Sequence, residues 1–212
     1  MLAGAFQVAD AVAAQARSDA QTAYNFLASL SPTAILTGQD LGGLILTPGV
    51  YFFASSAQLT GTLTLDALDD PNALFVFQIG STLTTASASM VNVIKGGAGT
   101  GVFFDVGSSA TLGTSSVFAG NILASQSITL NTTATILCGR AIALNGAVTM
   151  DTNTISNNCD GEGDFGSGRT DFGSIGFGGA DSVTDVPEPA TFLLIGLGIA
   201  LAVRRTMTRR QT

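Results

Sequence analysis

The fold is decided by residues 111–132, TLGTSSVFAGNILASQSITLNT, in which the phrase Thr-Leu-x-Thr occurs twice, 18 residues apart. Variants of the phrase also begin at Thr64, Thr82 and Thr149, so successive starting positions are 18, 29, 18 and 20 residues apart. Between them, short runs of Val, Ile, Leu and Phe alternate with polar residues and end at Gly, Asn or Asp, as strands do. A period of 18–20 residues predicts a β-solenoid with about three short strands per coil. A β-sandwich is the alternative, but it has no reason to repeat one phrase.

The segment before these repeats has a different period. Residues 5–30 lack Gly and Pro and place apolar residues, mostly Ala, at steps of three and four. This pattern predicts one amphipathic helix of about seven turns. Ser31-Pro32 ends it, because a residue before proline avoids the helical region. A stripe of Ala lets such a helix lie close against a flat surface.

Composition excludes several classes of function. Charged residues make up 11% of the chain and there is no His, so the usual acid–base enzyme at neutral pH is not expected. Four of the eight basic residues lie in the last nine positions, so the rest offers no patch for nucleic acid. We interpret the Gly-rich insert 95–101 as a loop, the acidic stretch 160–171 as a linker and the pair Asp69-Asp70 as a turn. We therefore expect no enzyme activity, cofactor or metal site.

The remaining chain divides into two parts. Residues 157–185 are rich in Gly, Asp and Ser and carry six acids and one Arg, which predicts a flexible acidic linker. Residues 186–212 contain an apolar run, 190–203, that predicts a short hydrophobic helix, followed by two pairs of Arg. Its 14 residues fall short of the roughly 17–25 that span a bilayer. A basic end that stays cytoplasmic during export predicts a transient contact with the inner membrane.

Two resemblances follow from these residues. The tail resembles the PEP-CTERM sorting signal of Gram-negative bacteria, in the order expected: Pro187, Glu188, Pro189, the apolar run, Arg204 and Arg205. This resemblance implies export to the cell surface or the medium and processing by an exosortase. Residues 9–156, which include GQDLGGLILTPGVY at 38–51 and LTGTLTLDALDDPNALFVF at 59–77, resemble the DUF3494 ice-binding family. That resemblance implies a mainly β, discontinuous β-solenoid of triangular cross-section over residues 1–156, with one long helix packed along its axis.

One feature departs from the family. Members usually begin with a signal peptide and several strands, whereas here Met1 lies almost at the helix and no signal peptide is recognisable. Either the start codon is misassigned or the chain is a truncated copy.

The function implied is adsorption to an ice crystal surface; the alternative is a structural or adhesive protein of the extracellular matrix without affinity for ice. An ice-contacting face needs a rigid, repeated array of hydroxyl and methyl groups, which stiff threonine rotamers supply. With Leu130 pointing inward, parity along the strands predicts one outer row of ice-contacting residues, which Asp66 and Asp151 interrupt. Its members are Thr64, Thr82, Thr84, Thr111, Thr129, Asn131 and Thr149. A competing face consists of Ala119, Asn121, Ala141 and Ala143.

Cys138 and Cys159 are the only two cysteines. In an exported protein we expect them to form a disulfide; two buried free thiols are the alternative.

Overall fold

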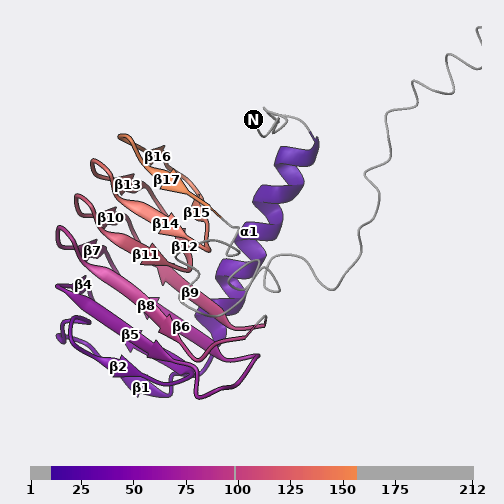
Figure 1. Ribbon diagram of the computed structural model, residues 1–212. Helices are drawn as coiled ribbons and strands as arrows, with labels where there is room; N and C mark the ends of the chain where they lie inside the picture. The colour runs from indigo at the N-terminus through magenta and orange to yellow at the C-terminus, as the bar shows by residue number, and fades with distance from the viewer. Residues whose placement is uncertain (1–10, 98, 157–212) are drawn as a thin grey trace, which may run out of the picture. The chain divides into compact units, whose positions relative to one another are not determined.

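The computed structural model describes residues 11–97 and 99–156, which form one helix and three parallel β-sheets (Figure 1). Sheet A contains, from edge to edge, β1 (Ala34–Ile35), β3 (Gly49–Phe53), β6 (Leu74–Ile79), β9 (Gly101–Val106), β12 (Asn121–Ala124) and β15 (Ala141–Ala143). Sheet B contains β4 (Ala57–Leu59), β7 (Leu83–Thr85), β10 (Ala110–Leu112), β13 (Ile128–Leu130) and β16 (Val148–Thr149). Sheet C contains β2 (Ile45–Leu46), β5 (Thr62–Asp66), β8 (Met90–Ile94), β11 (Val117–Ala119), β14 (Thr135–Leu137) and β17 (Thr154–Ile155). The predicted solenoid is confirmed.

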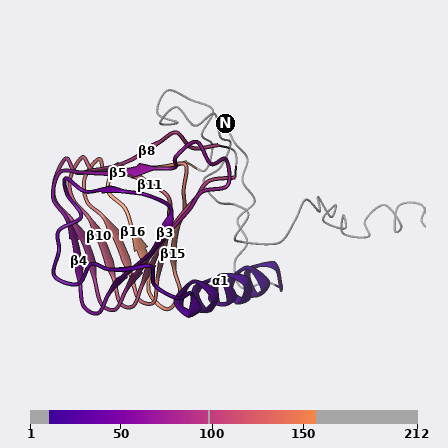
Figure 2. The ribbon, with the colours of Figure 1, turned by 90° about the horizontal axis from the view of Figure 1, so that it is seen from below.

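The chain visits sheets A, B and C in turn, and the coils superimpose when they are seen along the stack (Figure 2). In the later coils the paired residues are 18 and 19 positions apart, as for Phe104, Ile122 and Ala141. In the earlier coils they are 26 and 27 positions apart, as for Tyr51, Phe77 and Phe104. Loops at the corner between sheets C and A lengthen these earlier coils.

Two of these corner loops stack on each other. The Gly-rich insert 95–101 lies against the turn at Pro71, whose carbonyl accepts the N–H of Gly99 at 2.7 Å. A Cβ on Gly97 would lie 2.5 Å from the Cα of Pro71. The glycines of the insert therefore permit close packing of one loop on the next.

An aromatic stack fills the interior of the solenoid. The rings of Tyr51 and Phe77 lie 5.4 Å apart, and those of Phe77 and Phe104 lie 4.5 Å apart and nearly parallel. Phe118 continues the stack from sheet C, with its ring 4.6 Å from that of Phe104. Because parallel coils place equivalent residues directly above one another, one Phe per coil builds a continuous core.

The helix α1 (Ala11–Ser29) lies on the outer face of sheet A. It falls within the predicted helix 5–30, of which residues 5–10 lie outside the described residues. Its Leu27 packs in a second cluster with Val76, Phe103 and Leu123 from three neighbouring strands. The side-chain amide of Gln78 donates to the carbonyl oxygens of Leu27 at 2.7 Å and Leu30 at 2.8 Å, which satisfies the end of the helix. The helix thus covers one of the three outer faces of the solenoid.

Candidate functional site

The outer face of sheet A is closed to a large flat ligand because α1 covers it. Asn121, at the start of β12, and Ala119, at the end of β11, are both 0% exposed. Ala141 and Ala143 pack against the main core. The competing face expected from these four residues is therefore wrong, since none of them forms part of an open surface.

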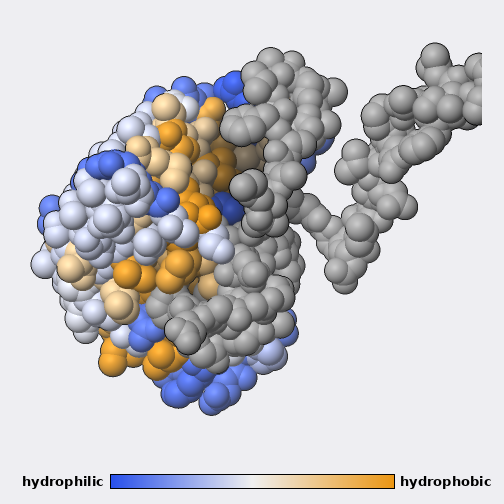
Figure 3. Space-filling view, turned by 45° about the horizontal axis from the view of Figure 1, so that its top comes forward, coloured by the Kyte–Doolittle hydropathy of each residue, from blue (hydrophilic) through white to orange (hydrophobic). Residues whose placement is uncertain are grey.

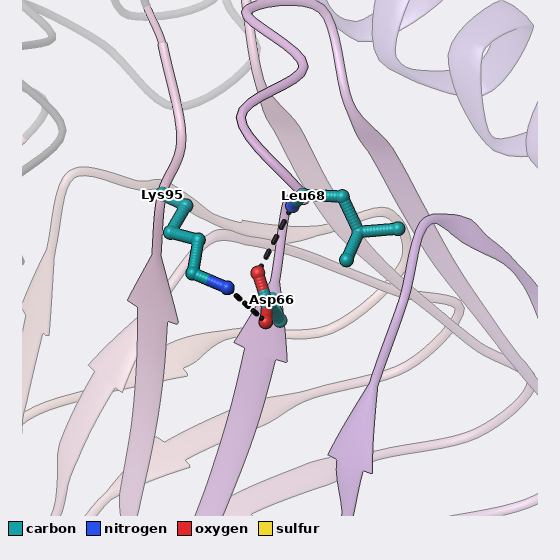
Figure 4. Close-up of polar contacts among 3 residues, drawn as sticks. All are labelled: Asp66, Leu68 and Lys95. Carbon is teal, nitrogen blue, oxygen red and sulfur yellow. Dashed lines mark hydrogen bonds and ion pairs between the residues drawn. The ribbon is translucent and has the colours of Figure 1, made fainter.

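The outer face of sheet C carries charge. The ammonium of Lys95 lies 2.8 Å from a carboxylate oxygen of Asp66, and the N–H of Leu68 donates to the other oxygen at 3.0 Å (Figure 4). These hydrogen bonds, the one from Lys95 first, lower the pKa of Asp66. Ile45 on the same face is 71% exposed. Sheet C therefore presents an ion pair and a large apolar side chain rather than a uniform surface.

The outer face of sheet B carries a row of threonines in exact register. Thr84 pairs with Thr111, Thr111 with Thr129, and Thr129 with Thr149. Gln58 continues this threonine row in β4. Among the described residues none of the four threonine hydroxyl groups forms a hydrogen bond, so all four are available to water.

A second hydroxyl row runs beside the first, and the sequence analysis missed most of it. This serine row consists of Ser56, Thr82, Ser109 and Ser127, each one residue before an inward-facing residue of sheet B. The hydroxyl of Thr82 donates to that of Ser56 at 2.8 Å, and the hydroxyl of Ser109 accepts the N–H of Ser127 at 3.3 Å. The signal was present in the sequence as a Ser or Thr two positions before Thr84, Thr111 and Thr129, whereas Ala147 occupies this position before Thr149.

These two rows define a regular grid. Neighbouring coils of a parallel sheet lie about 4.8 Å apart, and alternate residues of a strand lie roughly 6.6–7 Å apart. None of the described strands of sheet B contains a charged residue. The candidate site is thus a neutral array of hydroxyl and methyl groups with two fixed repeats.

The predicted site residues occupy four different places in the structure. Thr84, Thr111, Thr129 and Thr149 form the threonine row, Thr82 belongs to the serine row, and Asn131 is exposed at the corner that follows β13. The prediction that Thr64 lies on the same face is wrong, because it pairs with Ile45 and Asn92 in sheet C. Asp66 is also in sheet C, so it does not interrupt the threonine row. Asp151 lies at the corner after β16, where it accepts a hydrogen bond from Thr132.

Comparison with known proteins identifies the domain that carries this face. Residues 1–156 match the family model described as "Ice-binding-like". The chain belongs to the ice-binding-like family. An ice-binding protein of Nostoc sp. (strain HG1) is 67% identical over 156 residues, which cover 74% of this chain and 58% of that protein. Ice-binding protein 1 of Shewanella frigidimarina (strain NCIMB 400) is 36% identical over 67% of this chain and 16% of its own length.

Solved structures agree with this assignment. An ice-binding protein from an Antarctic biological consortium has a TM-score of 0.65 and 44% identity, covering 69% of this chain and 67% of that chain. The DUF3494 domain of ice-binding protein 1 of Shewanella frigidimarina has a TM-score of 0.62 and 35% identity, covering 71% of this chain and 66% of that one. This member of the family therefore shares its fold with experimentally solved ice-binding proteins, but spans little more than half of the Nostoc relative.

The other predicted sites of this family member lie partly or wholly outside the described residues. Residues 185–210 match the PEP-CTERM protein-sorting motif, as predicted from Pro187, Glu188, Pro189, Arg204 and Arg205. The linker 157–185 and the helix predicted at 190–203 are not described, and no helix within residues 11–97 and 99–156 is long and apolar enough to cross a membrane. Cys138 is 1% exposed and disulfide-bonded. Cys159, its predicted partner, lies outside the described residues.

Proposed function

We propose that this protein adsorbs to ice through the outer face of sheet B, with the threonine row at the centre of the contact. The observation that carries the proposal is the register of Thr84, Thr111, Thr129 and Thr149 on a face without charged strand residues. Each hydroxyl anchors a water molecule and each methyl group keeps the remaining water weakly held. The spacings of about 4.8 Å and roughly 6.6–7 Å are of the size of the repeats in an ice crystal.

The rigidity of the scaffold supports the same function. The threonine side chains are β-branched and stiff, so little rotamer freedom is lost when they meet a crystal surface. The strands below them are fixed by a continuous core in which Leu112 and Leu130 are 0% and 1% exposed. The side chains of this face are therefore ordered before they contact ice, which favours binding to a solid lattice.

The relatives support ice as the partner rather than the matrix-scaffold alternative, since their names state ice binding. The sorting motif supports export, exosortase processing and display at the cell surface or release into the medium, with a transient contact of the tail at the inner membrane. Within this proposal the protein is not an enzyme and needs no cofactor, because the face works by geometry alone.

The test is partition of the full chain into slowly growing ice. Wild-type protein is expected in the ice fraction, and it is expected to keep small ice grains from coarsening. A chain carrying Thr129→Tyr and Thr149→Tyr is expected to stay in the liquid with an unchanged melting temperature, because two phenol rings project from the face without entering the core. Wild-type protein that remains in the liquid and grains that coarsen as in buffer contradict the proposal.

A further inference from the structure

Residues at the corner between sheets B and C adopt a strained backbone conformation. Ala88, Ser115, Thr133 and Thr152 have φ angles of 57°, 55°, 59° and 53°. They occupy equivalent positions in successive coils, because each lies two residues before a paired residue of sheet C. The left-handed region suits glycine, and a β-branched residue in it is an outlier. Such outliers cluster at functional positions.

The hydroxyl group of Thr133 gives a reason for the strain. It donates to the carbonyl oxygen of Thr132 at 2.7 Å and lies 2.7 Å from the hydroxyl of Ser115 in the preceding coil. A hydroxyl group has one proton, so Ser115 is the donor in the second bond. Both side chains are exposed, so neither is needed to fill the core. A glycine is unstrained at either position but removes this bond between coils.

Side-chain hydrogen bonds join neighbouring coils at this corner at every step of the threonine row. At the first step, the N–H of Gly113 donates to the hydroxyl of Thr85 at 2.9 Å. At the second step, Ser115 donates to Thr133. Both bonds lie at the carboxyl ends of the sheet B strands, next to the threonine row.

The third step has two such contacts. The hydroxyl of Thr132 donates to the carboxylate of Asp151, and the side-chain amide of Asn153 donates to the carbonyl oxygens of Asn131 at 2.7 Å and Ala134 at 2.9 Å. The side chains that make these bonds form the corner ladder: Thr85, Ser115, Thr132, Thr133, Asp151 and Asn153. In Figure 3 the left margin of the molecule, where this corner lies, is mostly pale, the colour of weakly polar residues such as Ser and Thr.

The corner ladder opposes the ordinary twist of a sheet. Neighbouring strands usually rotate by about 20–25°, so the four strands of the threonine row would turn by roughly 60–75° in total. Such a rotation directs the outer threonines along different axes and prevents simultaneous contact with one crystal plane. The coils of this protein instead superimpose in the view along the stack (Figure 2). Flat sheets of this kind are stabilised by specific side-chain ladders.

We propose that the corner ladder holds the threonine row flat and in register, so that its members are positioning residues of this face. The opposite edge of sheet B is joined in the same way by two contacts of the serine row, Thr82 with Ser56 and Ser109 with Ser127. Both edges are thereby fixed from coil to coil, and the threonine hydroxyls between them remain available to water. The consequence for ice adsorption rests on the proposed function.

The corner ladder is tested first without ice, by amide hydrogen exchange of the full chain. The N–H of Asn131 donates to the carbonyl oxygen of Leu112 at 3.0 Å, between the same two coils as the bond from Ser115 to Thr133. Its exchange is expected to be about fivefold faster in Thr133→Gly, in Ser115→Gly and in the double variant, because each of them loses the same single hydrogen bond.

Three controls separate the corner ladder from general flexibility. The N–H of Ser125 donates to the carbonyl oxygen of Val106 at 2.9 Å between the same coils at the other edge of sheet B, and its exchange is expected to stay unchanged. Ala88→Gly introduces glycine at the equivalent position of an earlier coil, where there is no hydroxyl to lose, and is expected to leave the exchange of Asn131 unchanged. Thr133→Ser keeps the hydroxyl and is expected to behave as wild type. Equal exchange of Asn131 in Thr133→Gly and Ala88→Gly overturns the proposal.

Partition into growing ice then tests the positioning role. Thr133→Gly and Ser115→Gly are each expected to lower the fraction of protein in the ice by up to about fivefold, and the double variant by no more than either. Their melting temperatures are expected to stay close to that of wild type, because relief of the strained conformation offsets the lost hydrogen bond. Ala88→Gly and Thr133→Ser are expected to enter the ice as wild-type protein does.

Three results overturn the positioning role. The first is unchanged adsorption to ice together with faster exchange of Asn131. The second is a pair of losses that add in the double variant, since these indicate direct contact of each hydroxyl with ice. The third is a loss of adsorption that only follows a lower melting temperature. Wild-type protein that stays in the liquid contradicts the proposed function, whereas the exchange experiment still decides on the corner ladder.

Discussion

Asp105 makes the stability of this protein depend on pH. Its side chain lies under α1 on the outer face of sheet A, is 5% exposed, and has one carboxyl oxygen without a hydrogen-bond partner. Its neighbours in the sheet are Gln78 and Leu123, and Tyr24 faces it from the helix. Burial raises the pKa of Asp105 from 3.8 to about 7, and burial together with the nearby Asp105 raises the pKa of Tyr24.

The size of the effect follows from proton linkage. Between pH 3.8 and about 7 the folded protein holds a proton on Asp105 that the unfolded chain has released. The folded state therefore loses stability as the pH rises through this range, and the loss is complete above the folded pKa. At 1.36 kcal/mol for each pH unit, the loss amounts to roughly 4 kcal/mol.

The assay is urea unfolding of the full chain at pH 5 and pH 8.5, compared with Asp105→Asn. The amide has nearly the same shape and carries no charge, so the variant keeps the packing but removes the titration. About two pH units of this titration lie between pH 5 and the folded pKa of about 7, so wild-type protein is expected to lose about 3 kcal/mol more than the variant between these two pH values. Equal pH dependence of the free energy of unfolding in the two proteins refutes the reasoning.

Three further predictions concern the scaffold. Phe104→Ala removes the middle of the aromatic stack, where the ring is 0% exposed, and is expected to cost about 3–5 kcal/mol in urea unfolding; a cost below that of an exposed residue such as Phe26→Ala contradicts the packing. Gly139→Ala places a Cβ 1.9 Å from the carbonyl oxygen of Gly120 and is expected to lower the free energy of unfolding by roughly 1–3 kcal/mol. An unchanged melting temperature contradicts this close approach of Gly139 to Gly120. Reduction of the predicted bond between Cys138 and Cys159 is expected to cost about 3 kcal/mol, with non-reducing mass spectrometry of exported protein as the check, and two free thiols as the contrary result.

The sequence predicted the solenoid because its later coils are nearly uniform. Thr111, Thr129 and Thr149 are 18 and 20 positions apart and stack directly on one another. In such a region the repeat period and the inward–outward alternation along a strand are enough to predict where a side chain lies. Each equivalent residue recurs after one coil, and alternate side chains share a face.

The same reasoning misplaced residues in the earlier coils. Thr64 and Thr82 are 18 positions apart, as if they were one coil apart, yet they lie on sheets C and B. The corner loops at 67–73 and 95–100 lengthen these coils, so equal spacing along the chain no longer means equal position in space. Parity alone identifies an outer side chain but does not identify which of three faces it occupies.

The sequence also did not indicate which face is open. Asn121 looked like a surface residue but is 0% exposed, and its side-chain amide donates to the carbonyl oxygen of Val102 at 3.2 Å. The covering of sheet A by α1 likewise depends on contacts between segments distant in the chain, such as Leu27 with Phe103. Composition and periodicity carry no information on such contacts.

The account depends most on the claim that sheet B, and no other face, meets ice. Thr111→Tyr and Thr64→Tyr are a matched pair for its test, because both residues are outward-facing, partly buried threonines within strands, one on sheet B and the other on sheet C. The measurement is the fraction of each full-chain variant that partitions into growing ice. The account predicts that Thr111→Tyr stays in the liquid while Thr64→Tyr follows wild-type protein into the ice; the reverse result contradicts it.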